Sequence, residues 1–351
     1  MAGGITQEEL QLAARNHGMP LEALRHDLTP RGLHYLLIHY DIPAVDAAAF
    51  RLEVRGRVGR ELSLSLADLR ERERVDVPVT FECAGNGRAQ LDPRPVSQPW
   101  LVEAVGTAMW TGTPVRAVLE EAGLLEDAVD VVFAGEDRGV EGGVPQRYER
   151  ALPVAEALSG EPLLAYAMGG EPLPPQHGFP LRLVVPGWYG MTNVKWLSEI
   201  RVLDRAFDGY QHARAYRFMR SDDDPGAPVS RMEPRSLMVP PGVPDFMTRE
   251  RFVAPGPVRL EGRAWSGWAP VEAVEVRAGD GPWEPAALEP PLGPAAWRRW
   301  TFDWTATPGT HVLACRARDA TGRVQPDDPP WNVKGYANNA VHRVTVTVRD
   351  A

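Results

Sequence analysis

Short runs in which apolar and polar residues alternate make up most of this chain, and they fall into two blocks. In the first block, the run VDVPVTFEC sets Val75, Val77, Val79, Phe81 and Cys83 at every second position. This is the spacing of one face of a β-strand, so we expect Cys83 to end a strand on its core side.

Helical segments lie among these strands. Thr113-Pro114 precedes one helical segment and Gly123 follows it, as expected of a polar cap, a proline in the first turn and a glycine after the last turn. Helices do not follow the strands in regular order, which predicts an α+β fold rather than repeated βαβ units.

The second block begins near residue 258, where alternating strands are separated by Gly, Pro and Asp turns, as in an antiparallel sandwich of about 100 residues. Residues 221–257 between the blocks are dense in proline, the composition of an extended connector. We therefore expect an N-terminal extension at 1–35, a first domain at 36–235, a connector at 236–257 and a sandwich domain at 258–351.

The charge balance restricts the kind of partner. Among the 351 residues, 47 acidic and 38 basic side chains give a formal charge of −9, so no net positive field favours nucleic acid or an anionic membrane. The sequence shows neither an apolar stretch of about 18 residues nor an apolar leader segment. It predicts a cytoplasmic protein whose partner is a small molecule or another protein.

The chain has two cysteines, Cys83 and Cys315, too few for a disulfide scaffold, a closed structural zinc site or a haem-attachment motif. Alternation predicts that Cys315 is an inert core thiol. Cys83 leaves its strand into Gly85-Asn86-Gly87, with Arg88 following. We expect a thiol with a depressed pKa that could bind a metal, the remaining ligands coming from a cofactor. A packed core cysteine before a turn is the alternative.

A second cluster contains His177, Arg182 and Lys195, placed around a buried strand. Cations beside an apolar strand need an anionic partner, which the phosphate of a cofactor would supply; surface ion pairs at the strand ends are the alternative. His34 and His39 are five residues apart, which on a strand would put them on opposite faces and argues against a shared metal.

Four motifs follow one another along the chain. They are Cys83-Ala84-Gly85-Asn86 with Arg88, His177-Gly178-Phe179-Pro180 with Arg182, Val194-Lys195-Trp196, and Pro330-Trp331-Asn332 with Gly335. Their order and spacing resemble the sulfite oxidase family of molybdopterin-dependent oxidoreductases, from about Tyr35 to Val348. The resemblance implies a molybdopterin-binding catalytic domain followed by an all-β immunoglobulin-like domain that forms a homodimer.

The resemblance also implies roles for single residues. Cys83 would bind molybdenum beside the dithiolene of a single pterin, with no haem in this chain. Arg88, Tyr216 and Lys334 would be catalytic at the substrate end, and Trp100 would form a pocket wall. The remaining cofactor contacts implied by the family are Tyr35, His39, Asp137, His177, Arg182, Asn193, Val194 and Lys195.

The chain departs from the family pattern at two arginines. Leu37 stands where the family commonly has an arginine, and Lys334 stands where it has another. The tripeptide Arg15-Asn16-His17 spells the missing Arg-Asn-His motif, but it lies 22 residues before the aligned tripeptide Leu37-Ile38-His39. We interpret it as a coincidence.

The resemblance implies oxygen-atom transfer on a small oxyanion. The leading hypothesis is oxidation of sulfite to sulfate, with electrons passed to an external acceptor such as a cytochrome. Because Leu37 removes a charge, a second hypothesis is reduction of an S-oxide, an N-oxide or nitrate on the same fold. The third is a non-enzymatic binding protein that uses the sandwich domain for interaction.

Overall fold

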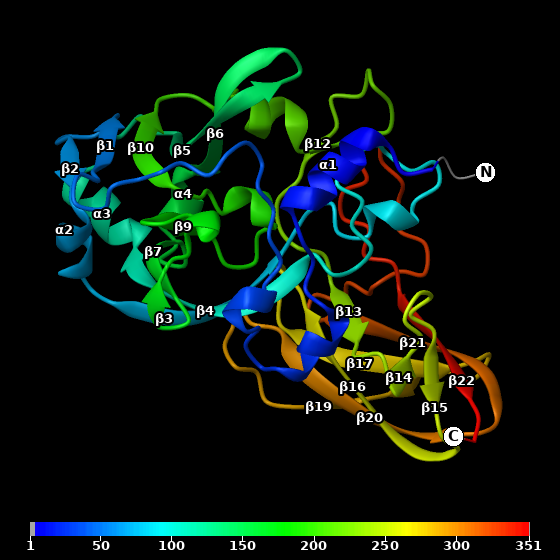
Figure 1. The fold of residues 1–351 in the computed structure, drawn as a ribbon. Coiled ribbons are helices and arrows are strands. Elements are labelled where there is room, and N and C mark those ends of the chain that lie inside the picture. Colours follow the sequence, from blue (N-terminus) through cyan, green and yellow to red (C-terminus); the bar gives the residue numbers. More distant parts are fainter. Residues whose placement is uncertain (1–3, 351) are drawn as a thin grey trace.

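The computed structural model describes residues 4–350, and its two sheet-rich parts lie against each other (Figure 1). The first part contains a five-stranded sheet in the order β2-β1-β10-β5-β6. Only β1 and β10 are parallel in this sheet, and its other neighbours are antiparallel. The strand bounds are β1 Leu52–Gly56, β2 Leu62–Leu64, β5 Asp130–Glu141, β6 Val144–Pro153 and β10 Leu197–Leu203.

A second sheet of the first part has the order β3-β4-β7-β8, with β9 also paired to β7. The alternation predicted from Val75 to Cys83 is confirmed, because Val79, Phe81 and Cys83 are buried in one apolar cluster and Val75 and Val77 pack against it. The bounds are β3 Val75–Glu82, β4 Val105–Pro114, β7 Leu163–Met168, β8 Glu171–Pro172 and β9 Arg182–Val184.

Few helices accompany these sheets. The predicted helix forms as α3 Val115–Ala122, and its C-cap Gly123 has φ of 69°, a conformation that favours glycine. The predicted polar cap at Thr113 is wrong, because Thr113 belongs to β4, Pro114 is the N-cap rather than a first-turn residue, and no side chain caps the helix. The others in the first part are α2 Leu66–Arg70 and α4 Val154–Ala157. Among residues 4–350, no helix combines the length and the apolar character needed to cross a membrane.

The second part consists of two packed sheets, in the orders β13-β16-β20-β19 and β14-β15-β22-β21-β17-β18. Cys315 is buried among apolar side chains there, as predicted. The bounds are β13 Arg235–Met238, β14 Val243–Pro244, β15 Arg251–Val253, β16 Gly256–Trp265, β17 Val271–Ala278, β18 Glu284–Pro285, β19 Ala287–Leu288, β20 Arg298–Ala306, β21 Gly309–Asp319 and β22 His342–Val348.

The predicted connector at 236–257 differs from the structure. Its residues form β13, β14 and β15, and β13 pairs with β16 while β15 pairs with β22. Pro240 and Pro241 lie between strands rather than inside them, so the prolines remove few ladder hydrogen bonds. The second part therefore starts near Arg235.

The N-terminal segment packs across both parts. Its helix α1 Gln7–Arg15 begins with a capping box between Thr6 and Glu9, which satisfies free N–H groups of the first turn. The buried Glu9 carboxylate is also paired with Arg94 of the first part. Further along, Asp27 pairs with Arg263 of the second part at 2.9 Å.

Candidate active site

Cys83 follows directly on β3 and begins a tight loop. Its N–H donates to the Ala104 carbonyl at 2.9 Å, and its carbonyl accepts from the Asn86 N–H at 2.9 Å. Gly87 has φ of 91°, and a Cβ there would lie 2.6 Å from the Asn338 carbonyl oxygen. The glycine therefore lets the loop turn while the second part lies close against it.

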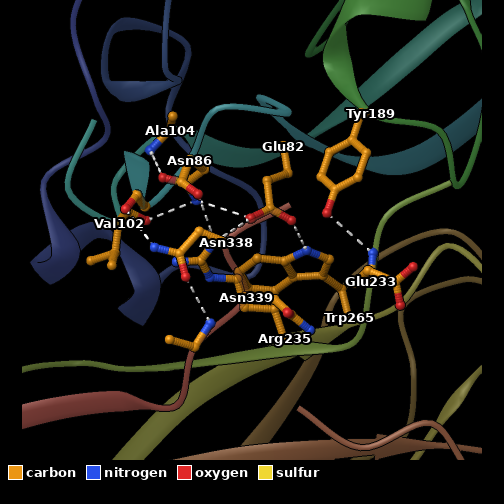
Figure 2. A network of polar contacts seen from close by, with 12 residues as sticks. Glu82, Asn86, Val102, Ala104, Tyr189, Glu233, Arg235, Trp265, Asn338 and Asn339 are labelled. Atoms are coloured by element: carbon orange, nitrogen blue, oxygen red, sulfur yellow. Dashed lines mark hydrogen bonds and ion pairs between the residues drawn. The ribbon is translucent and has the colours of Figure 1, made fainter. Parts of the chain in front are cut away.

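A polar network fixes this loop to the second part (Figure 2). Glu82, just before Cys83, accepts from Arg235 at 2.7 Å and from the Trp265 indole at 2.8 Å. Asn86, just after the loop begins, donates to Glu82 at 3.0 Å and accepts from the Ala104 N–H at 3.0 Å. The two residues that flank the thiol are thus held by buried hydrogen bonds.

Two cavities meet at Cys83, because its side chain lines both of them. The first cavity contains most of the predicted cofactor contacts, and the second contains the predicted substrate residues Arg88, Trp100 and Tyr216. The first is lined by His34, Tyr35, Leu36, Leu37, His39, Phe81, Cys83, Ala84, Asp137, Tyr148, His177, Arg182, Gly190, Met191, Asn193, Lys195 and Tyr216.

Arg182 is a fully buried cation beside the first cavity. Its guanidinium stacks on Trp110 and donates to the carbonyls of His177 and Asn193 at 2.9 and 3.1 Å. Burial lowers its pKa to about 10. Its Nε has no hydrogen-bond partner, and no carboxylate within residues 4–350 forms an ion pair with it. A buried charge of this kind calls for an anion.

Lys195 and Asp137 face each other across the same cavity. The Lys195 ammonium donates to the carbonyls of Leu37 and Gln176 at 2.8 and 3.0 Å. Burial lowers its pKa to about 7, although Asp137 opposes this change. Burial also raises the pKa of Asp137 to about 6, and one of its buried carboxylate oxygens has no partner. Both groups are therefore poised to bind a polar ligand.

His34 and His177 add two neutral imidazoles to the first cavity. Burial lowers the pKa of His34 to about 4 and that of His177 to about 2. The ring centroids are 5.5 Å apart, and the buried Nε2 of His34 has no partner. The prediction that His34 and His39 lie on opposite faces is wrong, because the segment is irregular and both line this cavity. Sequence reasoning therefore missed His34.

Arg88 is held in the second cavity by several contacts. Its Nε donates to the Lys334 carbonyl at 2.8 Å, and one terminal nitrogen donates to Ser97 Oγ at 3.0 Å. The guanidinium also lies over the Tyr336 ring, which stacks on Tyr216 with centroids 5.2 Å apart. These contacts orient the planar cation toward the cavity.

The aromatic side chains keep their protons at this site. Among them, the Tyr216 hydroxyl is a group that could lose a proton. Burial raises its pKa well above the usual value, so it can donate a hydrogen bond at neutral pH. Trp100 is buried beside Cys83, where its indole N–H favours the thiolate. The second cavity is lined by Leu12, Arg15, Leu37, Ile38, His39, Tyr40, Cys83, Gly85, Arg88, Ser97, Gln98, Trp100, Val140, Glu141, Ala215, Tyr216 and Tyr336.

Two predicted site residues lie outside both cavities. The Lys334 side chain is exposed, and the residue contributes its carbonyl to Arg88 instead of its ammonium to the cavity. Val194 packs in the apolar core, and its carbonyl accepts from the Leu183 N–H at 2.8 Å. The backbone next to Lys334 is closely packed, since a Cβ on Gly335 would lie 2.8 Å from Arg88.

The predicted pKa of Cys83 also needs correction. Burial raises the pKa of the thiol, and the nearby Arg88 guanidinium offsets only part of this effect. The sequence suggested a depressed pKa because the thiol ends a strand beside backbone donors, but only 9% of Cys83 is exposed. A bound cation would have to supply the stabilisation of the thiolate.

Comparison with known families agrees with this geometry. Residues 39–211 match the oxidoreductase molybdopterin binding domain, and residues 229–349 match the Mo-co oxidoreductase dimerisation domain. The fold and its paired cavities therefore define a molybdopterin-dependent oxidoreductase with a β-rich C-terminal domain.

Individual relatives show which family of molybdopterin-dependent oxidoreductases the chain resembles. Over 336 residues the chain is 37% identical to sulfite oxidase of Gallus gallus, covering 90% of this chain and 72% of that protein. It is 34% identical to mitochondrial sulfite oxidase of Homo sapiens, covering 92% and 62%, and 29% identical to nitrate reductase 2 (NADH) of Phaseolus vulgaris, covering 95% and 41%. The chain belongs to the sulfite oxidase family.

A solved structure has the same fold. The sulfane dehydrogenase SoxCD from Paracoccus pantotrophus superposes with a TM-score of 0.81 at 23% identity, covering 99% of this chain and 93% of that chain. The long coverage shows that both sheet-rich parts of this chain occur together in that fold.

The first cavity fits a phosphorylated pterin. Arg182 and Lys195 provide cations, and the unpartnered atoms of Asp137 and His34 provide hydrogen-bonding groups. Among residues 4–350, no three His, Cys, Asp or Glu side chains group closely enough to hold a metal ion. Cys83 therefore fits as a lone protein ligand whose metal takes its other ligands from the pterin.

Proposed function

We propose that this chain oxidises sulfite to sulfate and passes the electrons to an external acceptor. The observation that carries the proposal is the position of Cys83 between a cationic cavity suited to a phosphorylated pterin and a second cavity containing Arg88. Sulfite and water would give sulfate, two protons and two electrons. The bound molybdenum would supply the oxygen transfer and accept the electron pair.

The protein's own residues would bind and orient the anion. Arg88 is fixed by Lys334 and Ser97, so its charge is in place before the anion arrives. Tyr216 remains protonated and would donate a hydrogen bond from the same wall. The buried Trp100 indole N–H lies beside Cys83 and would stabilise its thiolate.

Rapid mixing with sulfite tests this proposal directly. We expect purified holoenzyme to contain about one molybdenum per chain, and anaerobic sulfite to bleach the absorbance of the oxidised centre. The variant Cys83→Ser should fold but lose this response, whereas Cys315→Ser should keep it because Cys315 lies in the core of the second part. A fully active Cys83→Ser enzyme would exclude the proposed centre.

Reduction of an S-oxide, an N-oxide or nitrate is the second candidate. Leu37 in place of an arginine favours it, because a less charged substrate needs fewer cations, and nitrate reductases are among the relatives. A steady-state comparison of sulfite oxidation with viologen-driven reduction separates the two reactions. The third hypothesis, a non-enzymatic binding protein, is set aside because the chain belongs to an oxidoreductase family.

We also infer that the second part has an immunoglobulin-like fold and joins two chains in a homodimer. The two packed sheets, antiparallel except for the pair β15 and β22, and the match to a dimerisation domain support this inference. Light scattering at micromolar concentration should give twice the chain mass of 38.7 kDa; a monomer would contradict it.

The remaining proposals concern cofactors, acceptor and location. We propose one pterin and no haem in this chain, with an external protein such as a cytochrome as acceptor; pterin-to-molybdenum ratios and a haem spectrum test the first two. A cytoplasmic location stays a prediction from the sequence, and cell fractionation tests it.

A further inference from the structure

Arg15 lies in the second cavity together with Leu37, although 22 residues separate them in the sequence. From the sequence alone, this separation indicates that the match of Arg15-Asn16-His17 to the family motif is a coincidence. The structure places this tripeptide at the cavity to which the family's Arg-Asn-His motif would contribute its arginine. Arg15 reaches the cavity from the end of α1, an element that precedes the matched domain at 39–211.

Backbone pairing aligns the two segments. The His17 N–H donates to the Leu36 carbonyl at 3.1 Å, and the Leu36 N–H donates back to His17 at 2.8 Å. The Ile38 N–H donates to the Asn16 side chain at 2.6 Å. The bridge between His17 and Leu36 sets Asn16 opposite Leu37 and Arg15 opposite Ile38 in an antiparallel contact, and Arg15 and Leu37 both line the second cavity.

Buried contacts hold this arrangement in place. Asn16 is buried and also donates to the Gln98 side chain at 2.9 Å, and Gln98 lines the same cavity. At the other end of α1, buried Glu9 pairs with Arg94. Leu12 lies one turn before Arg15 and lines the cavity as well, as neighbours three apart on a helix do. The helix thus forms one wall of the cavity.

The electrostatics of the cavity favour an anion between the two arginines. Arg15 is exposed, and its guanidinium has no recorded hydrogen bond or ion pair to any of residues 4–350. The carboxylate in the cavity, Glu141, already accepts from His39 and Gln211 at 2.8 and 2.7 Å. Arg88 supplies the second cation. Two guanidinium groups facing one cavity suit a tetrahedral oxyanion.

We propose that Arg15 is the second arginine of the substrate site, provided by α1 at the place left by Leu37. This inference rests on the proposed function, since it assigns a residue to the same oxyanion. It means that the N-terminal segment is part of the active site and sets its specificity for dianions. Reduction of uncharged oxides would gain nothing from this residue.

Sulfate binding to the molybdenum-loaded enzyme tests the assignment without turnover. By calorimetry, Arg15→Gln should weaken sulfate binding about 10- to 100-fold, the loss expected for a charged hydrogen-bonded pair. Arg15→Lys should recover part of the affinity, since it keeps charge but not the planar fork. The double variant Arg15→Gln with Leu37→Arg should recover most of it.

The control is Arg25→Gln, an exposed arginine of the same N-terminal segment that lines neither cavity. It should bind sulfate like the parent enzyme, and thermal unfolding should be unchanged in both single variants. Unaltered sulfate binding in Arg15→Gln, or an equal loss in Arg25→Gln, would overturn the inference. A further outcome is that the parent enzyme fails to oxidise sulfite while Arg15→Gln still binds sulfate more weakly than the parent does. In that case the proposed function fails, but the assignment of Arg15 to an anion site stands.

Turnover gives a second, separable measurement. Removing a contact made equally to bound substrate and transition state raises KM and leaves kcat nearly unchanged. We expect this pattern for Arg15→Gln with sulfite. A fall in kcat with unchanged KM would contradict a role in binding the anion.

Discussion

Glu82 and Arg235 form an ion pair at 2.7 Å in which each side chain is only 2% exposed, and it joins the strand before Cys83 to the first strand of the second part. The Trp265 indole donates to the other Glu82 oxygen at 2.8 Å. The pair is thus fully surrounded by protein, and it links the Cys83 loop to a sheet that begins 152 residues after Cys83.

Breaking this pair should destabilise the whole protein. We expect Glu82→Gln to lower the free energy of unfolding by about 3–5 kcal/mol, because a buried Arg235 loses its counter-charge. Urea denaturation measures the change. The control Asp127→Asn removes an exposed pair with Arg57 and should have a much smaller effect. Similar losses in both variants would show that the burial of the Glu82 pair is unimportant.

Arg88 and Lys334 should differ sharply in their effect on sulfite oxidation. Arg88→Gln should raise KM about 10- to 100-fold, because a charged hydrogen bond to the anion is lost. Lys334→Ala should leave KM within about twofold, because its side chain is exposed outside both cavities and its carbonyl remains available to Arg88. Steady-state kinetics compare the KM for sulfite of the two variants. A large increase in KM for Lys334→Ala would show that the Lys334 side chain acts in the substrate site.

Arg182 should be needed to retain the cofactor rather than to fold the chain. Arg182→Met keeps a long apolar stem on Trp110 but removes the buried cation. We expect the purified variant to contain about a tenth or less of the parent's pterin, since the loss of one charged contact costs at least tenfold in affinity. Fluorescence of the released, oxidised pterin measures its content.

The matched control is Arg116→Met, which replaces an exposed arginine of α3 that is paired with Glu120. It should retain the parent's pterin content. Equal pterin content in the parent and in Arg182→Met would contradict the assignment of the first cavity to the cofactor.

His342 should make the protein sensitive to acid. Burial lowers its pKa to about 3, and its Nδ1 accepts from the Met238 N–H at 3.0 Å. Because the folded pKa lies below the unfolded value of about 6.5, the unfolded chain binds more protons between these values. Its contribution to stability is complete above about pH 6.5 and is lost as the pH falls toward 3.

Urea unfolding at pH 7 and pH 5 tests this dependence. Below pH 6 the parent should lose up to about 1 kcal/mol per pH unit more than His342→Gln, whose amide can accept the same hydrogen bond without titrating. Equal losses in the two proteins would show that His342 does not carry this sensitivity.

Much of the fold could be predicted from the sequence because strand faces and helix ends are local signals. The alternation ending at Cys83 and the limits of α3 are of this kind. The boundary near Arg235 was misplaced because prolines at strand ends resemble a linker in composition, while pairing with β16 depends on residues far along the chain.

The candidate site likewise has residues that local motifs predict and residues whose positions depend on contacts between distant segments. Motifs predicted Cys83, Arg182 and Lys195, which the structure brings to one cavity. They could not place the Lys334 side chain, which is exposed in the structure, because a motif does not specify which way a loop residue faces. The position of Arg15 also escaped prediction, since it depends on an antiparallel contact between two irregular segments that carry no strand pattern.

The contacts from residues 334–339 to the Cys83 loop have a practical consequence for exchanging domains between relatives. The Ala337 N–H donates to the Ala84 carbonyl at 2.8 Å, and the Asn338 amide donates to the Gly87 carbonyl at 2.7 Å. In a chimera that joins a foreign C-terminal half to this chain, foreign residues would therefore make these contacts to the Cys83 loop. In such hybrids, residues 334–339 and the Cys83 loop should come from the same parent protein, so that the contacts between them are kept.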